Sequence, residues 1–407
     1  MKMVCVGGGP AGLYFSILAK LSNPKHDVTV VERNPAGVTY GWGVVFWDDL
    51  LDDLYRNDPV SARRIADSAA RWDTQEVHLR GEYATHIGGY GFALGRDRLL
   101  DILIRRAKGL GVDVRFQHDV TDPSELADAD LIVACDGVNS RLRQRHVNRF
   151  QTHVEEGRNK YIWLGTNKVF DAFTFAFEET PAGWLWFHGY RFNSETSTCI
   201  VECQETTWKA LGFDTLGPDE TLRKLEGIFQ SRLQGKSLFN QLKGMGKAPW
   251  LNFKRITNER WCHDNVVLMG DAAHTTHFSI GSGTKLAIQD AIELARQLRA
   301  HPEDLPAALD AYDEERRAAL LAIQLAARSS SEWFENVPSY VNQDATAFAY
   351  ALLNRRGSSV WSYLLLMASQ QPALQDVLRQ LHASKRWVRA QRRGRGAVAL
   401  RAPPPSP

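Results

Sequence analysis

Short apolar runs alternate with longer amphipathic segments through the first third of the chain. Residues 3–6, 28–31 and 131–134 are apolar runs of the length expected for buried strands. Between them, residues 11–21 and 98–110 repeat apolar positions at helical spacing. This alternation of strands and helices predicts an α/β fold with a parallel sheet covered by helices.

A different pattern begins near residue 160. Large apolar side chains, many of them aromatic, alternate with smaller or polar ones at 161–163, 173–177, 184–187 and 198–203. A period of two residues is typical of antiparallel strands. We therefore expect an antiparallel sheet packed as a second layer, one face of which walls a substrate cavity.

The first pattern returns after residue 261. It predicts a strand at 266–269, helices over 284–298 and 309–327, and then a helical C-terminal region. Two domains are therefore expected to be interleaved along the chain.

The turn after the first strand, Gly-Gly-Gly-Pro-Ala-Gly at 7–12, spaces three glycines as a dinucleotide-binding loop does. Gly7 allows a tight bend, Gly9 lets the backbone approach a pyrophosphate, and Gly12 lets the helix pack closely on the strand. The helix then presents N–H groups and the positive end of its dipole to the phosphates. Glu32 ends the second strand, where a carboxylate can bind a ribose hydroxyl. The sequence thus predicts binding of an adenine dinucleotide.

Three further motifs lie where a flavin-binding fold needs them. Arg96 begins a helix and can reach ribityl or phosphate oxygens, although, taken alone, it is better explained as a surface arginine. Asp136 begins an Asp-Gly turn after a buried strand, where it is also a plausible capping residue. Asp271 follows another strand and can bind the ribitol hydroxyls of a flavin. The glycines at 281 and 283 let backbone N–H groups of the next helix approach the flavin ring.

In this order and spacing, the motifs resemble those of the single-component FAD-dependent aromatic hydroxylases of the para-hydroxybenzoate hydroxylase type. The resemblance is closer to the salicylyl-CoA 5-hydroxylases and to the hydroxylase portion of the anthraniloyl-CoA monooxygenases. It is more distant to the pigment hydroxylase of violacein biosynthesis. The similar region runs from Met1 to about Arg356 and includes residues 157–166, 170–175 and 277–285.

The resemblance implies a Rossmann-like FAD-binding domain interleaved with an antiparallel-sheet substrate domain, and a helical C-terminal region. It implies an NAD(P)H- and O2-dependent monooxygenase that hydroxylates an aromatic ring through an FAD C4a-hydroperoxide, with NADH or NADPH as a transient reductant. The residues expected to bind FAD are Gly7, Gly9, Pro10, Ala11, Gly12, Glu32, Arg33, Arg96, Asp136, Asp271, Gly281, Gly283 and Thr284.

The substrate implied by the resemblance is an aryl-CoA thioester such as salicylyl-CoA. Residues 181–190 depart from the sequence expected on that strand, so an indole, a tryptophan-derived or a carrier-bound aromatic metabolite is the alternative. A halogenase shares the fold, but His188 and Gly189 stand where its signature has isoleucine and proline. The intact motifs and the aromatic second layer argue against a non-catalytic flavin module.

Three side chains are candidate catalytic residues. His188 and Tyr190 alternate with Trp186 on one face of a strand, a place suited to orienting a phenol or an amine. His277 precedes the flavin-side glycines and can help to deprotonate the ring substituent, because histidine titrates near neutral pH. Each histidine is equally compatible with a purely structural role.

The charge of the chain is unevenly distributed. The net charge is +2, but residues 385–401 carry seven Lys and Arg residues and no acid. We expect a solvated, disordered basic tail, with contact to an anionic partner as the alternative and no nucleic-acid role.

The domain limits follow from these patterns. We expect FAD-binding residues at 1–150, with a substrate-side excursion near 45–95, a β-sheet substrate domain at 151–255, a second FAD-binding part at 256–330, a helical region at 331–384 and the tail at 385–407. Five cysteines without paired or metal-like spacing and the early first motif predict reduced thiols, no metal site and a cytoplasmic location. No apolar run approaches the roughly 20 residues of a membrane span.

Overall fold

The computed structural model describes residues 1–81, 84–242, 246–357 and 363–399. The chain forms two units. Unit 1 consists of Met1–Thr39, Asp97–Gly157 and Lys254–Ala327, and unit 2 of Tyr40–Arg96, Arg158–Phe253 and the residues from Arg328 onward. The units divide the chain after residues 39, 96, 157, 253 and 327. The sequence pattern predicts an excursion near 45–95 and further limits at 150, 255 and 330.

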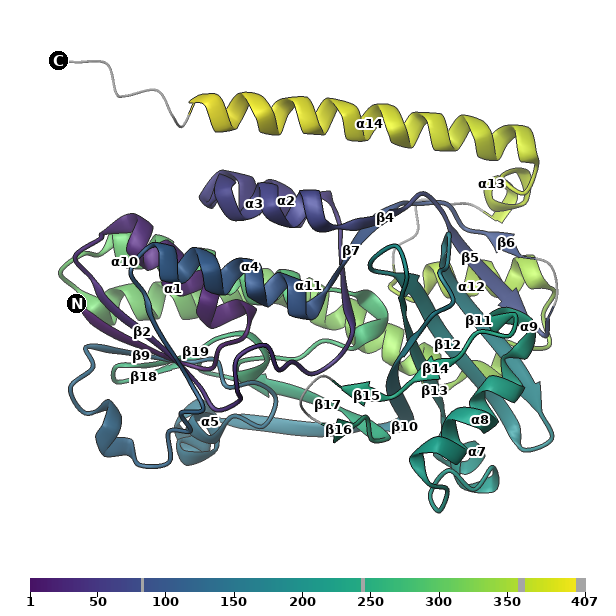
Figure 1. Ribbon diagram of the computed structural model, residues 1–407, viewed down its shortest axis with the longest axis horizontal. Helices are drawn as coiled ribbons and strands as arrows, with labels where there is room; N and C mark the ends of the chain where they lie inside the picture. The colour runs from purple at the N-terminus through teal and green to yellow at the C-terminus, as the bar shows by residue number, and fades with distance from the viewer. Residues whose placement is uncertain (82–83, 243–245, 358–362, 400–407) are drawn as a thin grey trace. The chain divides into compact units, whose positions relative to one another are not determined.

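A six-stranded sheet forms the centre of unit 1 (Figure 1). Its strands follow the order β18-β19-β9-β1-β2-β8. All neighbours are parallel except the edge pair of β18 and β19. Helices α1 and α10 pack against each other beside this sheet. The strands are β1 (Lys2–Val6), β2 (Asp27–Glu32), β8 (Asp113–Phe116), β9 (Leu131–Ala134), β18 (Cys262–His263) and β19 (Val266–Leu268). The helices are α1 (Pro10–Ser22), α4 (Arg96–Gly109), η1 (Pro123–Leu126), α5 (Arg141–Arg145), α6 (Val147–Phe150), η2 (Gly270–Ala272), η3 (Phe278–Ile280), α10 (Gly283–Ala300) and α11 (Leu305–Glu335). The residues of α11 from Arg328 onward belong to unit 2.

The register of this sheet brings the sequence motifs to one edge. Val6 at the end of β1 pairs with Val31 of β2 and with Ala134 of β9, and Ala134 pairs in turn with Leu268 of β19. Because parallel strands end at the same edge, the loops that follow them lie together. The predicted parallel sheet is thus confirmed, and its carboxyl edge carries the glycine turn, Glu32, the Asp-Gly turn and the Gly-Asp turn.

The main sheet of unit 2 has the order β14-β10-β13-β12-β11-β5-β6, with β17 paired to β10. Strands β10 to β13 pair antiparallel, as predicted, but β5 joins β11 in parallel, so the sheet is mixed. The sequence pattern did not reveal this pairing, because β5 belongs to the excursion before the aromatic segments. The strands are β5 (Gln75–Leu79), β6 (Thr85–His86), β10 (Thr152–Thr166), β11 (Phe173–Thr180), β12 (Gly183–Arg191), β13 (Ser197–Gln204), β14 (Leu238–Phe239) and β17 (Leu251–Asn258).

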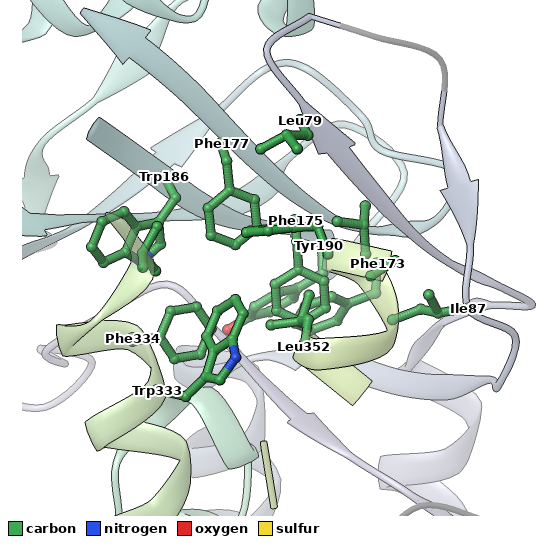
Figure 2. Close-up of a cluster of buried hydrophobic side chains, with 14 of the residues drawn as sticks. Leu79, Ile87, Phe173, Phe175, Phe177, Trp186, Tyr190, Trp333, Phe334 and Leu352 are labelled. Carbon is green, nitrogen blue, oxygen red and sulfur yellow. The ribbon is translucent and has the colours of Figure 1, made fainter. Parts of the chain in front are cut away.

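Both faces of this sheet are covered by apolar side chains. On one face, Phe177 and Trp186 pack against Trp333 and Phe334 of α11 (Figure 2). We call this set of buried residues, which also includes Trp72 and Tyr190, the aromatic cluster. The opposite face is covered by helices α8 and α9. Other elements of unit 2 are α7 (Glu205–Ala210), α8 (Pro218–Ile228), α9 (Gln230–Leu233), β15 (Gln241–Leu242), β16 (Gly246–Lys247), η4 (Val337–Ser339), α12 (Ala345–Asn354) and α13 (Tyr363–Ala368).

A small antiparallel sheet, β3-β7-β4, and the helices α2 and α3 complete the excursion of unit 2. These elements are β3 (Gly43–Phe46), α2 (Asp48–Asn57), α3 (Pro59–Ser68), β4 (Ala70–Trp72) and β7 (Gly91–Gly95). Within the described residues, no helix is both long and apolar enough to cross a membrane.

The basic segment differs from the expectation of a disordered tail. One helix, α14 (Pro372–Ala399), runs through the limit expected at residue 385, and residues 400–407 lie outside the described part of the chain. The helix is stable here because its cations meet carboxylates of unit 2. Arg393 contacts Asp48 at 2.7 Å and Asp52 at 2.6 Å, and Arg386 contacts Asp73 at 2.8 Å.

Candidate active site

The glycine turn of unit 1 is shaped by close packing on one side and open space on the other. Gly7 has a φ of 122°, and a Cβ there would lie 2.2 Å from the carbonyl oxygen of Cys135. A Cβ on Gly12 would lie 2.5 Å from the carbonyl oxygen of Gly7. A Cβ on Gly9, in contrast, would meet no described atom within 4 Å. The turn therefore forms a cradle whose open side is at Gly9.

Helix α1 begins at this open side. Gly9 is its N-cap residue, Pro10 occupies the first position, and no described side chain caps this end. The N–H groups of Ala11 and Gly12 lack partners within the helix by its geometry. Together with the helix dipole, they provide a place for phosphate oxygens.

Glu32 connects the end of β2 to the glycine turn. Its Oε2 accepts a hydrogen bond from the N–H of Gly8 at 2.8 Å, and its Oε1 accepts from the N–H of Asn34 at 2.8 Å. Oε1 also accepts from Nδ2 of Asn34 at 2.7 Å, whereas Oε2 has a second lone pair that can still accept from a ribose hydroxyl. Arg33, the next residue, is exposed.

In the carboxylate of the Asp-Gly turn, only one of the two oxygens has a hydrogen-bond partner among the described residues. Asp136 Oδ2 accepts from the N–H of Arg141 at 2.7 Å, which supports the start of α5. Asp136 Oδ1 is buried and has no hydrogen-bond partner among the described residues. Since buried acceptors are normally satisfied, this oxygen points to a hydroxyl or N–H supplied by a bound molecule.

The Gly-Asp turn is held by a buried ionic network that the sequence reasoning missed. Asp290 Oδ2 accepts from the N–H of Gly270 at 2.9 Å and contacts His274 Nε2 at 2.8 Å. Asp290 Oδ1 accepts from Arg316 Nε at 2.8 Å. Burial alone would raise the pKa of Asp290, but the charges of His274 and Arg316 and these hydrogen bonds lower it. The network fixes the turn that presents the exposed Asp271.

The start of α10 repeats the arrangement seen at α1. Gly281 has a φ of 64° and ends η3, and Ser282 is the N-cap of α10, with no side-chain hydrogen bond from the described residues to this end. Gly283 and Thr284 form the first turn of the helix. A Cβ on Gly270 would lie 3.2 Å from the Cβ of Ala11, so the Gly-Asp turn and α1 are in tight contact.

Two arginines complete the description of the cofactor motifs. Arg96 is the first residue of α4; its N–H donates to the carbonyl oxygen of Trp42 at 2.8 Å, and its side chain is half-buried. Arg143, to which the sequence analysis gave no role, is buried and donates to the carbonyl oxygens of Ala272 at 3.0 Å and Val138 at 2.7 Å. It thereby ties the Asp-Gly turn to the Gly-Asp turn.

Unit 1 thus fits FAD on observations of its own. The glycine cradle and the two uncapped helix starts suit the phosphates and the polar edge of a flavin ring. Glu32 and the unsatisfied oxygen of Asp136 are acceptors suited to sugar hydroxyls. The register of the sheet collects all of them at one edge.

The candidate catalytic residue His188 lies in unit 2, within the aromatic cluster. It is buried and packs against the rings of Phe175 and Phe334, whose centroids are 5.1 and 4.9 Å away. Its Nε2 lies 3.9 Å from Oε2 of Glu202. The structure therefore pairs His188 with a buried carboxyl group that sequence reasoning did not single out.

Glu202 is enclosed on β13. Its Oε1 accepts from Nδ2 of Asn159 at 2.7 Å, and its Oε2 accepts from Nε1 of Trp186 at 3.0 Å. Burial raises the pKa of Glu202 to about 7, even though these two hydrogen bonds lower it. The signal in the sequence was a glutamate within the otherwise apolar run from Cys199 to Cys203. A buried acid that titrates near neutral pH beside a histidine can exchange a proton.

The other two candidates have structural partners. Tyr190 is fully buried, donates its hydroxyl hydrogen to the carbonyl oxygen of Gly43 at 2.9 Å, and has a pKa raised by burial. His277 lies in unit 1, where its Nδ1 is 2.8 Å from the Ser279 hydroxyl and caps η3. Their catalytic roles remain predictions.

Arg355 is a second buried group that sequence reasoning missed. Its Nε donates to the Ser330 hydroxyl at 3.1 Å and its Nη1 to the carbonyl oxygen of Leu352 at 2.6 Å. Its guanidinium lies 5.5 Å above the ring of Phe175, and burial lowers its pKa well below the ordinary value. Arg355 and His188 therefore pack against the same two rings, those of Phe175 and Phe334.

Comparison with known proteins agrees with this geometry. A family model described as an FAD binding domain matches residues 1–325. Salicyloyl-CoA 5-hydroxylase of Streptomyces sp. is 40% identical over 366 residues, which cover 87% of this chain and 70% of that protein. A 3-hydroxy-4-methyl-anthranilyl-[aryl-carrier protein] 5-monooxygenase of Streptosporangium sibiricum is 35% identical over 338 residues, or 83% of this chain and 90% of that one.

A solved structure shows the same fold. A mutant of 2-methyl-3-hydroxypyridine-5-carboxylic acid oxygenase superposes with a TM-score of 0.69 at 20% identity, covering 89% of this chain and 99% of that chain. At this identity the likeness shows the fold alone.

Proposed function

The chain belongs to the FAD-dependent aromatic monooxygenases that carry this FAD-binding domain, and on that premise we propose that it hydroxylates the ring of an aryl-CoA thioester such as salicylyl-CoA. NADH or NADPH is the proposed reductant, and O2 supplies the oxygen atom. The observation that carries the choice of a thioester is the similarity to salicyloyl-CoA 5-hydroxylase over 366 residues.

Different parts of FAD are assigned to different residues of the chain. FAD, when bound, accepts a hydride from the nicotinamide and activates O2 for transfer to the ring. Gly9, Pro10 and Ala11 would hold the pyrophosphate at the start of α1. We assign the ribose of FAD to Glu32, with Arg33 beside it. Three side chains, Arg96, Asp136 and Asp271, are assigned to the other polar oxygens of FAD. The polar edge of the flavin ring is assigned to Gly281, Gly283 and Thr284.

We assign the proton transfer of the reaction to His188. Ring hydroxylation is easier when the hydroxyl or amino substituent of the substrate loses its proton, because the ring then carries more electron density. A neutral histidine can accept that proton. Glu202 is placed to stabilise the resulting imidazolium, because its Oε2 lies 3.9 Å from His188 Nε2. The apolar side chains around His188 would exclude water.

His277 is the second proposed base. Its Nδ1 caps η3, and the Ser279 N–H points to that nitrogen at 3.4 Å, which requires the tautomer with the proton on Nε2. In that tautomer Nε2–H can only donate to the substrate, so a base role would use Nδ1 after it releases the Ser279 N–H. Tyr190 is proposed as a positioning residue, because its hydroxyl joins β12 to β3 through Gly43.

A carrier-bound aromatic acid is the second candidate substrate. It is favoured by the relative that acts on an anthranilyl-[aryl-carrier protein], since that enzyme covers a similar share of this chain. The ring chemistry would be the same, and only the group attached to the carboxyl carbon would differ.

Oxidation of NADH and NADPH by the FAD-loaded protein tests the proposal. Rates are compared for salicylyl-CoA, anthraniloyl-CoA and the two free acids, and the products are examined by mass spectrometry. We expect stimulation by a thioester and a product heavier by one oxygen atom. If neither thioester stimulates oxidation, the thioester proposal is wrong, and aryl-carrier proteins become the next substrates to assay.

A further inference from the structure

A cavity of about 550 Å³ lies in unit 2, between α14 and the elements α2, α3, β4 and β7. We call it the α14 pocket. Its wall combines four arginines, Arg63, Arg71, Arg386 and Arg393, with the rings of Tyr55, Phe92 and Trp387. Its volume is that of a typical small-molecule site, and none of the roles assigned above uses it.

The arginines of the α14 pocket exceed the carboxylates that neutralise them. Arg393 contacts Asp48 and Asp52, whereas Arg71 and Arg386 share Asp73, at 3.2 and 2.8 Å. Among the lining residues that the structure describes, Asp48 is the single carboxylate.

Arg63 on α3 is the uncompensated charge of this wall. It makes no ion pair within the described residues and its side chain is exposed, whereas Asp48 is shared between Arg389 and Arg393. Guanidinium groups with spare N–H donors favour a ligand with phosphate groups.

The rings of the α14 pocket offer faces for stacking. Trp387 on α14 is 65% exposed although it lines the cavity, and Phe92 reaches it from β7. An exposed tryptophan beside arginines is the combination that binds a nucleobase with its phosphates, because the ring stacks and the cations pair. Inorganic phosphate alone would leave the rings without a partner.

We propose that the α14 pocket binds a phosphorylated adenosine, with the base against Trp387 and Phe92 and the phosphates on Arg63 and Arg71. Two molecules of this reaction carry that group: the CoA part of the substrate and the nicotinamide dinucleotide. The assignment of the ligand to CoA rests on the proposed function. The proposal that the pocket binds a phosphorylated adenosine does not depend on that function.

The small sheet of unit 2 relates the pocket to the aromatic cluster. Arg71 of β4 and Phe92 of β7 are paired and face the pocket, whereas Trp72 and Ala93 face the aromatic cluster. The α14 pocket and the aromatic cluster are therefore on opposite faces of one sheet.

Calorimetric titration of the FAD-loaded full chain tests this inference. The probes are CoA, adenosine 3′,5′-bisphosphate, NADPH, NADH and inorganic phosphate. The variants are Arg63→Ala and Trp387→Ala, both at exposed positions, and the matched control is Arg64→Ala, an exposed neighbour on α3 that does not line the pocket.

We expect each pocket variant to weaken the binding of CoA and of the bisphosphate by about tenfold or more, and Arg64→Ala to leave it unchanged. Weakened NADPH binding with unchanged CoA binding would support the pocket but assign it to the reductant. Unchanged binding of all nucleotides in both variants would overturn the inference. Because binding is measured without turnover, nucleotide binding by a protein that does not hydroxylate thioesters refutes only the proposed function.

Discussion

The Oε2 atom of Glu202 lies 3.9 Å from Nε2 of His188, and both side chains are buried on one face of the unit 2 sheet. Trp186 and Asn159 already donate to the two carboxylate oxygens. Both carboxylate oxygens are therefore hydrogen-bonded already, and Oε2 is the one that lies beside the imidazole of His188. Because of this pair, we expect the stability of unit 2 to depend on pH. We also expect Glu202 to exchange protons with His188, the proposed base.

Glu202 should make the protein less stable as the pH rises towards neutrality. Its pKa is 4.5 in the unfolded chain and about 7 in the folded one, so between these values only the folded state holds the proton. Stability should fall across this window by up to about 3 kcal/mol and become flat above it. Urea unfolding at several pH values measures this slope.

The variant Glu202→Gln cannot titrate and should lose that slope. Glu195→Gln is the matched control, because Glu195 is exposed. Equal slopes in the wild type and in Glu202→Gln would show that the carboxyl group does not titrate in this range.

His188→Gln should reduce the rate of hydroxylation while leaving the FAD content unchanged. General base catalysis contributes about 10²-fold or more, so kcat should fall by at least that factor. The pH profile of kcat should also lose its acidic limb, an effect that mere loosening of the core would not produce. A variant with a normal rate and profile would exclude His188 as the base.

Tyr190→Phe should cost stability rather than rate. The substitution removes one buried hydrogen bond to Gly43, worth about 1 kcal/mol. Thermal unfolding and kcat, measured on the same preparation, separate the two effects. A large drop in kcat without loss of stability would return Tyr190 to the list of catalytic residues.

The local motifs of the fold could be predicted from the sequence because each depends on neighbouring residues. The turn at 7–12 is dictated by the backbone freedom of glycine, and the strands of unit 1 by short apolar runs. The parallel pairing of β5 with β11 could not be predicted, since the two strands are distant in the chain and carry no mark of their partner.

The ion-pair partners of the charged residues could not be predicted from the sequence. Asp290 and Arg316 resemble ordinary solvated helix charges until the packing of α10 and α11 buries them together. The cations of α14 resemble a disordered tail because their partner, Asp48, lies 345 residues away. Charge patterns give sign and density, but they do not identify a distant partner.

The glycine cradle allows FAD binding to be separated from folding. Gly9→Ala should leave the unfolding of the apoprotein unchanged, because its Cβ would meet no described atom within 4 Å, but it should weaken FAD binding by filling the open side. Gly12→Ala should instead destabilise the fold by about 1–3 kcal/mol, because its Cβ would lie 2.5 Å from a carbonyl oxygen. Flavin fluorescence titration and urea unfolding measure the two effects. Equal FAD affinity in Gly9→Ala and the wild type would contradict the cradle.

Asp290→Asn should destabilise unit 1 strongly. The substitution leaves Arg316 buried without its counter-charge, a change that costs about 3–5 kcal/mol in comparable pairs. FAD should bind less tightly as well, since Gly270 loses its hydrogen bond to the carboxylate. Glu293→Gln is the control on the same helix. Similar melting temperatures for Asp290→Asn and the control would show that the network is dispensable.

Arg393 should hold the C-terminal part of α14 in place. It donates to the carboxylates of Asp48 and Asp52, and Asp48 also accepts from the hydroxyl of Tyr90. Burial alone would raise the pKa of Asp48, but these hydrogen bonds and the charges of Arg393 and Arg389 lower it. The ion pair of Arg393 with Asp48 should therefore persist at every pH above the ordinary pKa of an aspartate. It should weaken only when the pH falls below that ordinary value and Asp48 is protonated.

Arg393→Ala should raise hydrogen exchange along α14 at neutral pH, because the loss of the charged hydrogen bonds costs about 2 kcal/mol. Arg379→Ala is the matched control, since Arg379 pairs with Asp376 of its own helix. The exchange of α1 and α10 should not change in either variant. If α14 exchanges equally in Arg393→Ala and Arg379→Ala, the ion pairs with α2 do not hold this helix, and the wall of the α14 pocket must be maintained by apolar packing instead.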